Sequence, residues 1–365
     1  METLTFKNVQ RQPIEAQRVA AAKTAYTARR VDQSAITTLL SGDVGPRSVD
    51  LVLARVACLG HHKRIELVHG RRAPLFIGDE IIACFGNRYA PDQFEAQVPD
   101  SLVSCNLVAA GGIAGHCLSQ HGSTKSPTVI EPLGLLGDGN GRVINISDWA
   151  LQPSGTKRSR PLVFAVAGTS MNAGKTSSAA YFIKGLVNSG MRVGAAKVTG
   201  TGAGGDVWMM KDAGAAMVLD FTDAGLASTF RAGAAEVQGV FTRLTHILCE
   251  AEVDAIVVEV ADGLFQHETA ALLKSDVFRN GVDGVIFAAG EAMGACAGVK
   301  WLEQHDLSVL AISGRVSASP LASREVQRIT GLPVLNLERL SAEDIFVDLF
   351  AAAQEDGKTV VELGR

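Results

Sequence analysis

The sequence predicts an α/β protein with two domains. Residues 1–158 are expected to form a smaller β-rich, barrel-like domain with an N-terminal helix, and residues 159–365 a doubly wound, mainly parallel sheet. In the second half, short apolar runs alternate with helical stretches, which is typical of βαβ units. In the first half, short strand-like runs follow one another with Gly, Asn and Pro between them, which is typical of small barrels or sandwiches. Residues 147–161 combine Pro, Ser, Gly and basic residues, so we expect a linker there.

Within the first domain, residues 13–30 are rich in Ala, Gln and Arg at a loose helical spacing and predict the N-terminal helix. Strands are expected at 50–58, 64–68, 73–77, 81–85, 104–109, 128–130 and 142–146. Residues 86–95 are dense in polar side chains. They are either a substrate or partner loop in which Arg88 binds an anion, or a solvated turn. The Gly-rich stretch 109–115 lacks a Gly-Lys-Thr ending, so it does not predict a phosphate loop.

The second domain opens with a motif for phosphate binding. A strand-like run at 162–167 leads into a Gly-rich loop that ends in Gly174-Lys175-Thr176, and a helical stretch follows at 177–188. Strand, loop and helix in this order are the context of a Walker A motif. Gly174 lets the backbone approach a phosphate, loop N–H groups converge on it, and the helix adds its positive end. We expect Lys175 to reach the β- and γ-phosphates and Thr176 to bind Mg²⁺.

The loop departs from the strict motif in one place. Thr169 stands where the first glycine belongs, and Gly168 precedes it, so the loop is one residue longer. Arg315 is a further candidate, because it follows a later strand at the edge where such folds hold the base or a substrate. The residues expected to bind the nucleotide are Gly168, Thr169, Ser170, Met171, Asn172, Ala173, Gly174, Lys175, Thr176, Ser177 and Arg315.

Three charged residues lie where other strands are expected to end. Lys197 ends the strand at 191–197, Asp206 follows in a Gly-rich loop, and Glu259 lies in the apolar strand at 254–261. Ligands bind beyond the carboxyl ends of parallel strands, and a carboxylate there is the Walker B arrangement. The alternatives are a surface lysine and a carboxylate that points to the sheet edge. The residues expected to hold Mg²⁺ are Thr176, Asp206 and Glu259, and those expected to be catalytic are Lys175, Lys197 and Glu259.

The remaining segments complete the alternation of strands and helices. Further strands are predicted at 216–221, 283–288, 307–312 and 334–337, with a polar loop at 222–229. Helices are predicted at 207–216, 236–251, 299–304, 321–330 and 341–355.

The loop GTSMNAGKT at 168–176 resembles that of the dethiobiotin synthetase and cobyrinic acid diamide synthase group of P-loop enzymes, which reads G-T-D-T-x-x-G-K-T. That group has a strand ending in Lys-Pro-Val and another in Glu-Gly-Ala-Gly-Gly, where this chain has Lys197-Val198 and EVADG at 259–263. The departures are Ser170 for Asp, Val198 for Pro and Asp262 for Gly. The resemblance implies a P-loop NTPase fold and Mg-nucleotide binding, while the reaction carries over poorly.

A second resemblance covers the same domain. GMRVGAAK at 190–197, followed by Asp206 and Ala213-Gly214-Ala215, is similar to the GTP-binding adaptor of molybdopterin-guanine dinucleotide biosynthesis. That family has a G-x-R-V-G-x-x-K strand, an Asp-Ser pair and a downstream Ala-Gly-Ala, and Val207 stands here in place of the Ser. Relatives of this fold often form dimers, so the resemblance implies a homodimer. Neither family explains residues 1–158.

The composition argues against several classes of protein. The formal net charge of −4 gives no electrostatic reason to expect nucleic acid. No apolar run reaches the roughly 18 residues of a membrane span, and the first residues do not resemble a secretory signal. The six cysteines include no Cys-x-x-Cys pair, and Cys and His spacings fit no zinc pattern. We therefore expect a cytoplasmic protein with reduced thiols and neither membrane nor nucleic acid partners.

Two functions fit these features. The first is an ATP-dependent ligase or synthetase that phosphorylates a small carboxylate or carbamate, so that an amine can capture the product. Its substrate is then a small anionic molecule. The second is a nucleotide-gated adaptor or chaperone that uses GTP or ATP in cofactor biosynthesis or metallocentre assembly. The strand ends lack the [NT]-K-x-D sequence typical of guanine recognition, which favours ATP with Mg²⁺ over GTP.

Overall fold

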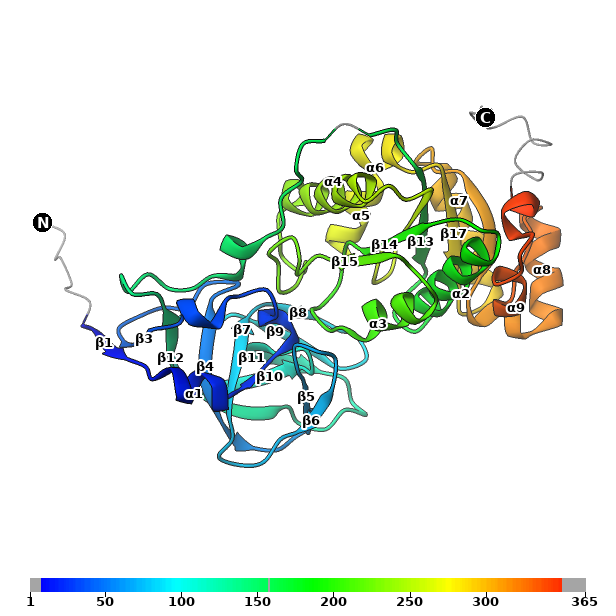
Figure 1. The fold of residues 1–365 in the computed structure, drawn as a ribbon. Helices are drawn as coiled ribbons and strands as arrows, with labels where there is room; N and C mark the ends of the chain where they lie inside the picture. The colour runs from blue at the N-terminus through cyan, green and yellow to red at the C-terminus, as the bar shows by residue number, and fades with distance from the viewer. Residues whose placement is uncertain (1–7, 157, 350–365) are drawn as a thin grey trace, which may run out of the picture. The chain divides into compact units, whose positions relative to one another are not determined.

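The computed structural model describes residues 8–156 and 158–349, which divide into two compact units (Figure 1). The first unit comprises the chain up to Leu151 together with two later segments, Thr201–Gly205 and Phe221–Arg231. The second comprises Gln152–Gly200, Asp206–Asp220 and the chain from Ala232 onward. The domains predicted at 1–158 and 159–365 are continuous stretches, whereas the first unit draws on three separate parts of the chain.

A ten-stranded, mostly antiparallel sheet forms the first unit, in the order β1-β3-β12-β4-β7-β11-β9-β8, with β10 beside β11 and β12 and with β2 beside β7. Its strands are β1 (Val9–Pro13), β2 (Lys23–Thr24), β3 (Thr38–Gly42), β4 (Leu51–Cys58), β7 (Glu80–Phe85), β8 (Arg88–Tyr89), β9 (Phe94–Gln97), β10 (Cys105–Ala109), β11 (Ile113–Gln120) and β12 (Thr128–Gly137). The strands β5 (Arg64–Glu66) and β6 (Arg72–Pro74) form a separate pair. Both faces of β4 are buried, because Leu51 and Leu53 join one hydrophobic cluster while Val52 and Ala54 join another.

Residues 13–30 do not form one helix, so that prediction is wrong. Only α1 (Ala16–Ala21) is α-helical, and Tyr26–Ala28 forms a single 3₁₀ turn. Between them, β2 pairs with β7 in the sheet, and Ala25 next to it is fully buried. Tertiary pairing and burial override the helix propensity of an Ala- and Arg-rich stretch.

Six strands of the first unit were predicted and six were not. The predicted strands at 50–58, 64–68, 73–77, 81–85, 104–109 and 128–130 correspond to β4, β5, β6, β7, β10 and the start of β12. The strand predicted at 142–146 is wrong, because this segment makes only isolated bridges at Val143 and Asn145. The sequence analysis missed β1, β2, β3, β8, β9 and β11. The exposed second half of β11 is polar and carries no alternating apolar pattern.

The segment Thr201–Gly205 is built into the first unit by close backbone contact. A Cβ on Gly111 would lie 2.0 Å from the carbonyl oxygen of Gly202, so only glycine fits there. The backbone N–H of Gly204 donates a hydrogen bond to the buried Glu66 carboxylate at 3.0 Å. The Gly-rich stretch 109–115 therefore packs closely against its neighbours in the first unit.

The segment Phe221–Arg231 is held in the first unit by a buried carboxylate. Asp223 is 3% exposed and pairs with Arg29 at 2.7 Å and Arg30 at 2.6 Å. Ala227 in the same segment belongs to the hydrophobic cluster that contains Leu51. This segment includes the predicted polar loop at 222–229, and its buried residues make it part of a core.

The second unit is an α/β fold on a six-stranded sheet in which every pair of strands is parallel, in the order β15-β14-β16-β13-β17-β18 (Figure 1). The strands are β13 (Leu162–Gly168), β14 (Val193–Lys197), β15 (Met217–Asp220), β16 (Ala255–Glu259), β17 (Gly284–Ala288) and β18 (Val309–Ser313). The helices are α2 (Lys175–Asn188), α3 (Gly205–Asp212), α4 (Ala234–Glu250), α5 (His267–Leu273), α6 (Asp276–Gly281), α7 (Ala292–Glu303), α8 (Pro320–Thr330) and α9 (Leu337–Leu340). The prediction of a parallel α/β sheet is confirmed, while the doubly wound arrangement stays a prediction.

Predictions in the second unit fail mainly near its end. The strand predicted at 334–337 is reduced to one bridge between Val334 and Ile312, after which α9 begins. The helix predicted at 341–355 lies partly outside the described residues, and it is helical only at 345–349 within them. The helices α5 and α6 were not predicted. None of the helices described is long and apolar enough to cross a membrane.

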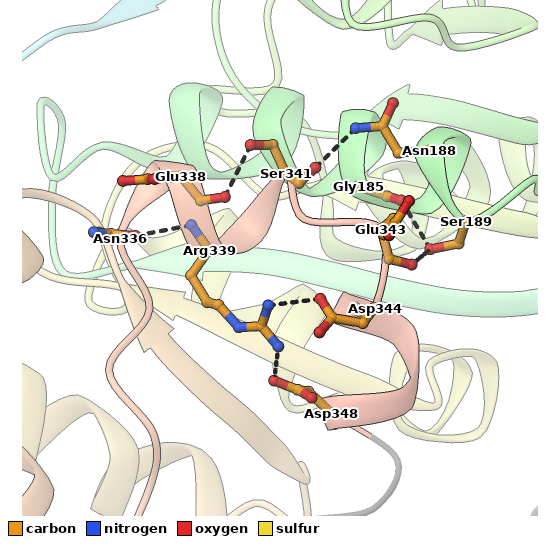
Figure 2. A network of polar contacts seen from close by, with 10 residues as sticks. All are labelled: Gly185, Asn188, Ser189, Asn336, Glu338, Arg339, Ser341, Glu343, Asp344 and Asp348. Atoms are coloured by element: carbon orange, nitrogen blue, oxygen red, sulfur yellow. Dashed lines mark hydrogen bonds and ion pairs between the residues drawn. The ribbon is translucent and has the colours of Figure 1, made fainter.

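A network of polar contacts holds the segment after α9 against the end of α2 (Figure 2). Asn188 donates to the carbonyl of Ser341 at 2.9 Å, and the Ser189 hydroxyl lies 2.6 Å from the carbonyl of Glu343. Arg339 binds Asp344 and Asp348 (Figure 2). Gly185 lies at the same contact, and a Cβ there would be 2.2 Å from the carbonyl oxygen of Leu340. The glycine in α2 is therefore needed for the close approach of α9.

We expect Gly185→Ala to destabilise the protein, although alanine is the better helix former. The new Cβ would also lie 2.7 Å from the Ile345 side chain, so α9 and the following turn must move. The expected loss is about 1–3 kcal/mol in the free energy of unfolding, measured with urea.

The matched control is Gly239→Ala in α4, where a Cβ would meet no atom within 4 Å. This substitution should stabilise the protein by about 0.5–1 kcal/mol. Equal effects of the two substitutions would contradict the packing argument.

Candidate functional site

The loop between β13 and α2, where the sequence predicts a phosphate-binding loop, packs closely against its neighbours. Gly174 precedes α2 with φ of 104°, in the left-handed region that favours glycine. A Cβ on Gly174 would lie 2.9 Å from the Cα of Gly314, and one on Gly168 would lie 2.7 Å from the carbonyl oxygen of Ala288. Thr169 fits where the strict motif has glycine, and its N–H donates to Ala288 at 3.0 Å. The backbone of the loop therefore packs directly against the ends of β17 and β18.

Lys175 is folded back over this loop. Lys175 is 6% exposed, and its ammonium group donates a hydrogen bond to the carbonyl oxygen of Ser170 at 2.7 Å. Burial lowers the pKa of Lys175, while the carboxylates of Glu259 and Asp262 oppose that effect. The hydrogen-bond acceptor of this desolvated ammonium group, the Ser170 carbonyl, is uncharged. An anion placed in the loop, such as a phosphate, would therefore interact with the ammonium group strongly.

Glu259 lies at the end of β16 beside the start of α2. The Thr176 hydroxyl donates to its Oε1 at 2.8 Å. The Oε2 atom is buried and accepts no hydrogen bond from any residue in the described part of the chain. Burial raises the pKa of Glu259, and repulsion from Asp206 adds to this effect. A buried carboxylate oxygen of this kind is a ligand that Mg²⁺ accepts, so the residues present fit a divalent cation.

Lys197 and Asp206 form a buried ion pair next to Glu259. The parallel register of β14 and β16 pairs Lys197 with Glu259, and Asp206 in the first turn of α3 binds the Lys197 ammonium. Burial lowers the pKa of Lys197, but Asp206 and Glu259 outweigh it and leave the pKa raised. Lys197 is therefore a fixed positive charge at the carboxyl end of the sheet, and it is not the surface lysine that the alternative interpretation required.

The structure brings together the five residues that were predicted to be catalytic or to hold Mg²⁺: Lys175, Thr176, Lys197, Asp206 and Glu259. Arg315 is exposed, and only its backbone N–H approaches the loop, donating to the carbonyl of Ala173 at 3.0 Å. The assignment of nucleotide binding to Arg315 and to the individual loop residues stays a prediction.

Sequence reasoning missed two carboxylates at this edge of the sheet. Asp262 is 9% exposed, has φ of 64° and lies close enough to influence Lys175 and Lys197. Asp220 is fully buried at the end of β15, where the register pairs it with Lys197. Two features of the sequence could have identified them. Asp262 belongs to an Asp-Gly pair close after an apolar strand, and Asp220 is the last residue of another strand.

Comparisons with known proteins give weak likenesses only. The sequence matches no protein-family model, and no curated protein matches it. The structure is similar to the signal recognition particle 54 kDa protein from Aeropyrum pernix in complex with GDP, at 18% identity, over 56% of this chain and 51% of that one, with a TM-score of 0.37. It is also similar to a nucleotide-binding protein from Archaeoglobus fulgidus in complex with ADP (13% identity; 56% and 94%; TM-score 0.38). A third likeness is the kinase domain of the Escherichia coli tyrosine kinase ETK, at 12% identity, over 42% of this chain and 66% of that one, with a TM-score of 0.32. At these scores the likenesses assign no function.

We expect Glu259→Gln to stabilise the folded protein at neutral pH. The amide oxygen still accepts the bond from Thr176, and the cost of burying a carboxylate disappears. Because the pKa of Glu259 is raised by folding, the wild type loses stability as pH rises above about 4.3, the ordinary glutamate value. The gain should therefore be absent below about pH 4 and grow with pH, measured by urea unfolding across the pH range.

Glu250→Gln is a control of opposite sign. Backbone N–H groups of Ser154, Gly155 and Thr156 donate to this carboxylate, and they lower its pKa. Its contribution to stability is present above the ordinary glutamate pKa and is lost as pH falls, so this variant should be less stable at neutral pH. A pH-independent difference between wild type and Glu259→Gln would contradict the electrostatic account.

Proposed function

We propose that this protein is a Mg²⁺- and ATP-dependent P-loop enzyme, a ligase or synthetase that activates a small carboxylate or carbamate by phosphorylation. The observation that carries the proposal is the buried Glu259 with its hydrogen bond from Thr176, next to the phosphate-binding loop and flanked by Lys175 and Lys197. A site of this composition suits phosphoryl transfer, where catalysis is mainly positioning and charge stabilisation.

The chain's own residues divide the work of binding. The N–H groups of the loop and the first turn of α2 would bind the β- and γ-phosphates, and Lys175 would exchange the Ser170 carbonyl for a phosphate oxygen. Thr176, Asp206 and Glu259 would hold Mg²⁺, whose positive charge stabilises the negative charge on the phosphates. Glu259 Oε2, buried and not hydrogen-bonded within the described residues, supports this assignment.

Lys197 supports transfer to an acceptor rather than simple hydrolysis. It is a second buried ammonium at the same edge of the sheet, and it would stabilise the transferring phosphoryl group together with Lys175. A carboxylate oxygen of the acceptor would attack the γ-phosphorus, the bond from that phosphorus to the β–γ bridging oxygen would break, and ADP would leave. An amine would then attack the acyl carbon of the resulting acyl phosphate and displace inorganic phosphate, and the amine nitrogen would lose a proton.

We expect Lys175→Ala to weaken MgATP binding by about 10- to 100-fold, because the loop loses the buried ammonium group that lies over it. Titration calorimetry with ATP and with GTP, each with Mg²⁺, measures the effect. Lys184→Ala, an exposed lysine on the same helix, should bind like the wild type. A preference for GTP would support the adaptor function, and binding of neither nucleotide by a folded wild type would contradict the proposal.

The ligase reaction itself is tested by release of ADP. Pools of small carboxylates with an amine donor should raise the rate above that of ATP alone, and Lys197→Ala should lose this stimulated rate while retaining nucleotide binding. A basal rate that no acceptor stimulates, combined with a partner protein captured in only one nucleotide state, would favour the adaptor.

A further inference from the structure

The first unit contains a cleft that has no part in the proposed reaction. It has a volume of about 460 Å³ and lies between the loop after β3 and the segment at 142–148 that follows β12. Its lining includes Asp43, Arg47, Asp50, Arg142, Asn145 and Asp148. This volume is within the range of about 300–1,000 Å³ typical of small-molecule sites. A second cavity of about 400 Å³ shares the Arg142–Asp148 wall.

Asp50 is the buried charge of the cleft. It is 5% exposed, and its carboxylate accepts hydrogen bonds from the Asn145 amide at 2.9 Å and from the Arg47 backbone N–H at 2.8 Å. Both of these donors are uncharged, and within residues 8–156 and 158–349 no cation forms an ion pair with it. Burial raises the pKa of Asp50, which records the cost of this arrangement. A cationic group of a ligand would offset that cost.

The charged groups of the cleft do not balance one another. Arg142 and Asp148 neutralise each other through two hydrogen bonds of 2.9 and 3.0 Å. Of the remaining groups, Asp43 and Asp50 are negative and Arg47 is positive. The Arg47 side chain makes no hydrogen bond or ion pair among the described residues. The cleft therefore repels polyanions such as a nucleoside triphosphate. It offers a negative group, Asp50, to a cation and a positive group, Arg47, to an anion.

The backbone around Asp50 is fixed at a conformational cost. Val49 has φ of 68°, an unusual value for a β-branched residue. Its N–H donates to Phe85 at 2.8 Å and its carbonyl accepts from Ile146 at 3.0 Å, so both of its backbone groups are held. Strained residues that neighbouring structure holds in place occur preferentially at binding sites.

We propose that this cleft binds a small zwitterion of the amino acid or dipeptide type, whose ammonium group pairs with Asp50 and whose carboxylate pairs with Arg47. The site is separate from the candidate nucleotide site in its residues, and its existence does not depend on the proposed function. Paired charges at a partly buried site give both affinity and a requirement that the ligand carry both groups.

The test uses the full-length protein and two sets of probes: the twenty L-amino acids and their Gly-Xaa dipeptides, screened by thermal shift and then by calorimetry. Each ligand that binds is compared with its N-acetyl form, which lacks the ammonium group, and with its C-terminal amide, which lacks the carboxylate. We expect N-acetylation to weaken binding at least about tenfold. Asp50→Asn should weaken binding of the unmodified ligand by a similar factor. This variant should bind the unmodified ligand and its N-acetyl form with equal affinity.

Arg47→Ala provides a second, independent comparison on an exposed side chain. It should weaken binding of the zwitterion but leave the affinity for the amide unchanged. Arg64 is an exposed arginine on β5, and Arg64→Ala should change neither affinity. Should Asp50→Asn fail to fold, the Arg47 comparison decides. The proposal is overturned when no probe binds, when neither cleft variant changes the affinity, or when Lys175→Ala alone abolishes it, since the ligand then occupies the nucleotide site.

Discussion

The candidate site depends on the parallel register of β14 and β16, which places Lys197 beside Glu259 at the buried end of the sheet. Burying either ion costs several kcal/mol, and the opposite charge beside it offsets part of that cost. A shift of either strand by one residue would turn one side chain to the opposite face and leave the other alone. Asp206 and Lys175 then extend the pair into a cluster of alternating charges. The positions of Lys197 and Glu259 thus follow from the pairing of two strands.

Glycines at a few close contacts keep this cluster in place. Gly168 and Gly174 let the loop lie directly against the ends of β17 and β18, and Gly314, directly after β18, makes the same close contact from the strand end. Because these contacts are between backbone atoms, they leave little room for rearrangement. A rigid loop presents its N–H groups without a cost of ordering when a phosphate binds. The buried Glu259 works against stability in the same region, which is typical of a site shaped by binding.

The sheet of the second unit was predictable because its strands are buried on both faces and read as continuous apolar runs. The charged residues of the site could be found for the same reason, since Lys197 and Glu259 interrupt such runs at their ends. The first unit was harder, because β9 and β11 are polar and the chain at 13–30 follows the sheet against its own helix propensity. Asp223 and Gly111 could not be interpreted from sequence, because their partners lie far away along the chain.

The division of the first unit into three parts of the chain also affects how the protein is made. Its last segment ends at Arg231, which follows Leu151 by 80 positions (231 − 151). At roughly 5–20 residues per second, a ribosome needs roughly 4–16 s to add them. During that time the core that receives Ala227 is incomplete, and apolar surface around Leu51 stays open to other nascent chains. The early part of this chain therefore exposes apolar surface during synthesis, well before the second unit has been completed.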